Sequence, residues 1–137
     1  MSDMSDSQLA EALERCTLDA SLFTHEAHLR VAFHFLQDTP WLDAVLRMRR
    51  ALQSYAIMLG KPGLYHETIT LAYMALIAER MAEQPRYTDA AAFLQANADL
   101  RRKGALLGHY SAQRLASERA RNQFMLGDLP LVHSGAG

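Results

Sequence analysis

Phe23-Thr24-His25-Glu26-Ala27-His28-Leu29-Arg30-Val31-Ala32 is the stretch that predicts the first long helix of this chain. Apolar residues recur in it at three- and four-residue intervals, and the pattern continues to about residue 37. Because a helix turns by about 100° per residue, Leu29, Ala32 and Leu36 share one face. We therefore expect a helix over residues 23–37 that is buried along this face.

The two histidines of this stretch are expected to point into the protein. His25 lies one turn before Leu29, and His28 lies one turn before Ala32, so both imidazoles share the apolar face. The polar residues that are expected on the solvent side are Glu26, Arg30 and His34.

Two more long helices are predicted, over residues 41–59 and 64–83. Thr39 suits the N-cap of the first, with Pro40 at its opening position, where the missing N–H costs nothing. Gly60, followed closely by a proline, is typical of a helix C-terminus. These three long helices are expected to form the core.

The whole chain is expected to be all-α, a compact bundle of about five to seven helices. No run shows the alternation of a β-strand, and alanine and leucine are abundant. The shorter helices are predicted over residues 7–15 and 88–95, in one or two pieces within 100–116, and over 117–124. The expected organisation is a disordered lead over 1–6, a single helical domain over 7–130 and a loose tail over 131–137.

Composition excludes several classes of protein. The 137 residues carry 14 Lys and Arg against 15 Asp and Glu, a net charge of −1, so no basic field for nucleic acid is expected. Cys16 is the only cysteine, which excludes a disulfide framework and favours a cytoplasmic location. No apolar run approaches the roughly 20 residues of a membrane span, and no Gly-rich loop for a nucleotide cofactor is present.

A cluster of three histidines is the main candidate site. His25 and His28 are close enough on one helix face to share a ligand, and His66 is expected to point inward from the third long helix. Three imidazoles with an open position are typical of catalytic divalent metals, here zinc, iron, nickel or manganese. The hydroxyls of Thr70 and Tyr73, on the face of His66, would orient the imidazoles. The alternative is that each histidine is a buried structural residue.

Four other features bear on the composition of the site. Arg49, at the edge of an apolar face, is a candidate for binding an anionic substrate, and His109, in a predicted break, is a candidate to close over the cluster. Glu26 and Glu67 each follow or precede an inward histidine, but a neighbouring residue on a helix points about 100° away, which disfavours them as ligands. The basic run 101–103 either binds a phosphate or carboxylate or forms a solvated face.

The two histidine stretches, Phe23-Thr24-His25-Glu26-Ala27-His28-Leu29-Arg30-Val31-Ala32 and Tyr65-His66-Glu67-Thr68-Ile69-Thr70, resemble the paired motifs of a family of short, uncharacterised bacterial helical proteins. The resemblance covers most of the chain and implies that the two stretches belong together, without implying an activity. A weaker analogy is to DinB-like bundles, which have a three-histidine metal site with an open position.

Two functions are therefore expected from the sequence. The first is a small cytoplasmic, metal-dependent enzyme that acts on a small polar molecule through His25, His28, His66, Thr70, Tyr73 and His109, with Arg49 on the substrate. The second is a non-catalytic helical module that binds a small molecule or forms a homodimer, with structural buried histidines. Membrane and nucleic-acid partners are not expected in either case.

Overall fold

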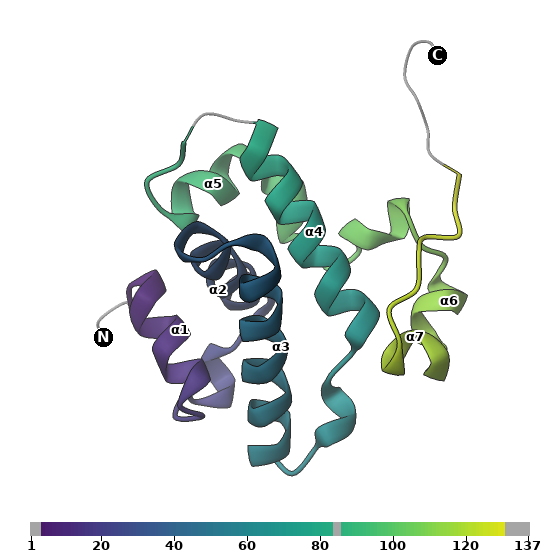
Figure 1. Cartoon of the computed structure of the whole chain (residues 1–137), viewed down its shortest axis with the longest axis horizontal. Helices are drawn as coiled ribbons and strands as arrows, with labels where there is room; N and C mark the ends of the chain where they lie inside the picture. The colour runs from purple at the N-terminus through teal and green to yellow at the C-terminus, as the bar shows by residue number, and fades with distance from the viewer. Residues whose placement is uncertain (1–3, 84–85, 131–137) are drawn as a thin grey trace.

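The computed structural model describes residues 4–83 and 86–130, and within these ranges it contains helices and no strand (Figure 1). This confirms the prediction of an all-α bundle of about five to seven helices. The expected tail over 131–137, with His133, lies outside the described residues. The α-helices are α1 (Asp6–Glu14), α2 (His25–Asp38), α3 (Trp41–Met58), α4 (Glu67–Glu83), α5 (Ala90–Ala96), α6 (Ala112–Ala116) and α7 (Glu118–Asn122). Short 3₁₀ helices lie between them, η1 (Ala20–Leu22), η2 (Pro62–Leu64), η3 (Ala98–Arg101) and η4 (Ala105–Gly108).

The core lies among α1, α2 and α3, with α4 and α5 closing it on the other side (Figure 1). Its largest fully buried side chains include Phe33 and Phe35 of α2 and Phe93 of α5. Burying one such side chain contributes roughly 1.5–3 kcal/mol. Two of the three long helices predicted from the apolar periodicity, α2 and α3, therefore build the core together with α1, while α4 contributes Met74 and Ile77 to it.

Local capping interactions set where the long helices begin and end. The Thr24 hydroxyl accepts a hydrogen bond from the backbone N–H of Ala27 and starts α2 at His25. After α3, Gly60 has a φ of +74°, the left-handed conformation that favours glycine at a helix C-terminus. The prediction for Thr39 was wrong, because its hydroxyl donates to the carbonyl of Phe35 at the end of α2, and Pro40 is the N-cap residue of α3.

The start of the chain is more ordered than its polar composition predicts. α1 begins at Asp6 rather than near Ser7, because Ser5 and Gln8 form a reciprocal capping box. Asp6 pairs with Arg30 of α2 at 2.8 Å, and its other oxygen accepts from the N–H of Ala90 at 2.9 Å. Arg30 was expected on the solvent side, but it pairs with Asp6 instead. A helical projection of α2 could not show this, because Asp6 belongs to α1.

The C-terminal segment attaches to α4 by a different kind of interaction. Within the described ranges, no residue after Leu100 belongs to the buried core cluster. Instead, α7 lies beside α4 and α6 packs on α7 (Figure 1), and side chain to backbone hydrogen bonds join the segment to α4. The Thr68 hydroxyl donates to the carbonyl of Gln123 at 2.8 Å, and the His66 imidazole donates to that of Leu115 at 2.7 Å.

Candidate functional site

A cavity of about 480 Å³ lies between α2, α3 and α4, and residues before α2 and after η3 complete its wall. Most of its lining is aliphatic or aromatic. Its polar side chains come mainly from α2 and from the start of α4. The lining residues are Ala20, Phe23, His25, His28, Leu29, Ala32, Met48, Leu52, Tyr55, Ala56, Leu59, Leu64, Tyr65, His66, Ile69, Thr70, Tyr73, Met74, Ile77 and Lys103.

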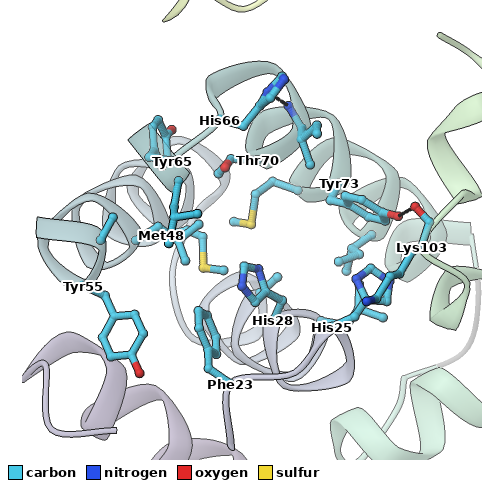
Figure 2. A pocket seen from close by; sticks show the side chains of 18 of the residues that line it. Phe23, His25, His28, Met48, Tyr55, Tyr65, His66, Thr70, Tyr73 and Lys103 are labelled. Atoms are coloured by element: carbon cyan, nitrogen blue, oxygen red, sulfur yellow. Dashed lines mark hydrogen bonds between the residues drawn. The ribbon is translucent and has the colours of Figure 1, made fainter. Parts of the chain in front are cut away.

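The structure brings five of the seven predicted site residues to this one cavity. His25 and His28 come from the first two turns of α2, while Thr70 and Tyr73 come from α4, and His66 directly precedes α4. Figure 2 shows His25 and His28 on one wall and His66 on the opposite wall. The periodicity therefore identified residues that share a cavity although they are about 40 positions apart in the sequence.

The imidazole of His28 faces the cavity and makes no hydrogen bond to any residue in the described part of the chain. Its ring stacks on that of Phe23, with centroids 3.9 Å apart and planes inclined by 20°. Burial, and to a smaller extent the nearby His25, lowers the pKa of His28 to about 4. At neutral pH the imidazole is therefore uncharged, with one nitrogen able to donate a hydrogen bond and the other able to accept one.

His25 lines the cavity but has one nitrogen committed to the protein. Its Nε2 lies 3.0 Å from the carbonyl oxygen of Leu100, and because a carbonyl can only accept, Nε2 carries the proton. The ring meets that of Tyr73 edge to face, with centroids 5.4 Å apart. This leaves Nδ1 of His25 as the nitrogen that is not used by Leu100.

His66 has both nitrogens engaged in hydrogen bonds. Nε2 donates to the carbonyl of Leu115 at 2.7 Å, and Nδ1 accepts from the backbone N–H of Ile69 at 3.1 Å. The second contact makes the imidazole the N-cap side chain of α4, which satisfies one of the free N–H groups of the first turn. These two hydrogen bonds explain how the polar side chain of His66 can be buried.

Arg49 lies outside the cavity lining. Its Nε donates to Glu67 at 2.9 Å, and the hydroxyl of Tyr65 donates to the same carboxylate oxygen at 2.5 Å. Burial, followed by the contact with Glu67, raises the pKa of Tyr65. Glu67 therefore links α3 to the start of α4, and it already neutralises the charge that was expected to bind a substrate.

His109 is exposed and does not line the cavity. It follows η4, and its carbonyl accepts a hydrogen bond from the N–H of Leu129 at 3.2 Å. The short helix η4 directs the chain from α4 toward α6, so His109 lies with the C-terminal segment. The predicted break near Gly108 is present, but it does not bring His109 over the histidines.

The chemistry of the donors gives limited support for a metal. Among residues 4–83 and 86–130 there is no group of three His, Cys, Asp or Glu side chains arranged to hold an ion. His66 would have to give up the bond to Ile69 or to Leu115 before it could coordinate a metal. The nitrogens that remain are Nδ1 of His25 and the two of His28, so the three-histidine metal site stays a prediction.

The sequence singled out Lys103 only as part of the basic run 101–103, with a solvated face as the alternative, and it did not assign Phe23, Tyr55 or Tyr65 to a site. Lys103 lies in the short segment between η3 and η4, where no periodicity indicates which way a side chain points. Phe23 and Tyr65 each lie just before a long helix. An aromatic residue immediately before a helix N-cap was the available signal for these two.

Comparison of the chain with protein-family models, with curated proteins and with solved structures finds no match. The resemblance to short bacterial helical proteins and the analogy to DinB-like bundles therefore stay predictions. In the described part of the chain, no helix is both long and apolar enough to cross a membrane.

Proposed function

We propose that this protein binds a small, largely apolar molecule in the cavity between α2, α3 and α4. The volume of about 480 Å³ lies within the roughly 300–1,000 Å³ of small-molecule sites. Such sites combine apolar walls with a few polar groups that fix the orientation of the ligand. The walls here are mainly aliphatic and aromatic, and the polar groups are few.

The observation that carries the proposal is the position of His28. A polar group that is removed from water without a partner costs roughly 1–3 kcal/mol. The imidazole of His28 is only partly buried, faces the cavity and makes no hydrogen bond within the described residues (Figure 2). No buried side-chain nitrogen or oxygen in that part of the chain lacks a partner, so the free nitrogens of His28 are open to the cavity. A ligand that fills the cavity would exclude water from this imidazole, and a ligand group that donates to it or accepts from it would avoid that cost.

The neutral fluorophore N-phenylnaphthylamine tests the proposal, because its emission rises when it leaves water for an apolar site. We expect saturable binding to the wild-type protein. Ala56→Phe places a ring into the cavity from α3 and is expected to weaken binding at least tenfold. Ala75→Phe is the matched control, since Ala75 is exposed on α4 and outside the cavity lining. Equal binding to wild type and Ala56→Phe, with both variants folded by circular dichroism, would contradict the proposal.

A metal-dependent enzyme is the second candidate, and the gathering of His25, His28, Thr70 and Tyr73 around one cavity supports it. The pKa of His28 weighs against simple acid–base catalysis, since a general base is most effective when its pKa is near the working pH. Elemental analysis of protein purified without an affinity tag, for wild type and His28→Ala, separates the two candidates. Stoichiometric zinc, iron, nickel or manganese that is lost in His28→Ala supports the enzyme, and metal-free wild-type protein contradicts it.

A further inference from the structure

The charge of the cavity lining indicates which kind of molecule fits it. Lys103 is the one charged side chain among the lining residues, and no Asp or Glu lies in that lining. Two neighbouring cations of this region are already paired, Arg101 with Glu26 and Arg80 with Asp99. Within the described ranges no carboxylate forms an ion pair with Lys103.

The cavity has a polar end at Lys103. The hydroxyl of Tyr73 lies 3.4 Å from the carbonyl oxygen of Lys103, which keeps the segment after η3 against α4. The ring of His25 lies beside Tyr73, so Lys103, Tyr73 and His25 are neighbours at this end (Figure 2). Lys103 is exposed, so that a charged group at this end of the cavity stays in contact with water.

The opposite end is apolar. Phe23 and Met48 line it, and Tyr55 contributes its ring (Figure 2). The hydroxyl of Tyr55 points away from the cavity (Figure 2), because it donates to the carbonyl of Leu18 at 2.6 Å. A charged group at this end would lose its hydration without a partner, which is costly.

We propose that the ligand of this cavity is an amphipathic monocarboxylate, with its apolar body between α2, α3 and α4 and its carboxylate at Lys103. This inference rests on the proposed function and adds the class of ligand. A cationic amphiphile would find no carboxylate in the lining, and a neutral one would leave the ammonium group of Lys103 without a counter-charge. His28 is uncharged at neutral pH, so it does not compete with Lys103 for the carboxylate.

Three ten-carbon amphiphiles that differ only in the head group test the class of ligand. Decanoate, decanol and decylamine are each titrated against protein loaded with N-phenylnaphthylamine, below their critical micelle concentrations. We expect decanoate to displace the fluorophore at the lowest concentration and decylamine at the highest. Equal displacement by all three would overturn the inference and leave the proposed function intact. Absence of binding by the fluorophore and by all three amphiphiles would overturn the proposed function itself.

Two lysine variants test the site of the carboxylate. Lys103→Gln is expected to weaken decanoate binding about two- to fivefold, the effect of losing one exposed ion pair, and to leave decanol binding unchanged. Lys61→Gln is the control, because Lys61 is the other lysine of the chain and lies outside the cavity lining. Higher salt should reduce the preference of the wild type for decanoate. Unchanged decanoate binding by Lys103→Gln would overturn the assignment of the carboxylate to Lys103.

Discussion

The partly buried, uncharged imidazole of His28 makes the stability of the protein depend on pH. An ordinary histidine in the unfolded chain takes up a proton near pH 6.5, whereas in the folded protein the pKa of His28 is lowered to about 4. Between these values the unfolded state binds the proton and the folded state does not. The contribution of uncharged His28 to the free energy of unfolding is therefore fully present well above pH 6.5, and it is lost as the pH decreases toward 4.

The size of the effect follows from the two pKa values. The difference between 6.5 and about 4 corresponds to about 3 kcal/mol when the whole range is crossed. Between about pH 7.5 and pH 5, linkage gives a loss of about 2 kcal/mol. Other groups titrate in the same range, so the contribution of His28 is the difference between the wild type and a variant without this imidazole.

Urea denaturation of wild type and His28→Leu at these two pH values measures that difference. We expect the wild type to lose about 2 kcal/mol more than His28→Leu in its free energy of unfolding. Met48→Leu is the control, because it alters the same cavity wall without removing a titrating group, and it should retain the wild-type pH dependence. Equal losses in wild type and His28→Leu, or an NMR titration of His28 with a midpoint near 6.5, would refute the reasoning.

Two other predictions concern the ends of helices. Gly60→Ala should lower the free energy of unfolding by about 1–2 kcal/mol. Gly60 has a φ of +74° and a Cβ there meets nothing within 4 Å, so only the backbone conformation is penalised. Chemical denaturation measures the loss, and an unchanged midpoint would contradict the prediction. His66→Asn should be about 1 kcal/mol more stable than His66→Ala, because asparagine can replace the N-cap bond to Ile69 but not the bond to Leu115; thermal denaturation compares the two variants, and equal midpoints would show that the cap is unimportant.

Local signals in the sequence predicted the three long helices well. The bounds of α2, α3 and α4 differ from the predicted ones by at most a few residues. Apolar periodicity and the turn at Gly60 depend only on neighbouring residues, so the helices and their ends could be predicted from the sequence alone. The same periodicity placed His25 and His28 on the cavity wall, since a helix that buries one face fixes where every residue on that face points.

The partners of the polar side chains were not predictable from local patterns. Arg30 was assigned to solvent from its place on the helix, although its partner Asp6 lies on α1. Arg49 was assigned to a substrate from its place at the edge of an apolar face, although its partner Glu67 lies on α4. The acceptor for His66 is the carbonyl of Leu115, 49 positions away. Such pairings depend on the packing of helices in three dimensions, and a helical projection contains only one helix.

The attachment of the C-terminal segment has a consequence for how the molecule opens. Since α6 and α7 are joined to α4 by hydrogen bonds and contribute nothing to the buried core cluster, they need not unfold together with it. Segments of this kind open with less free energy than the whole domain and exchange their amide protons first. Each opening would release the imidazole of His66 from Leu115 while α1, α2 and α3 remain folded. Detachment of the C-terminal segment would in this way free a side chain that lines the cavity.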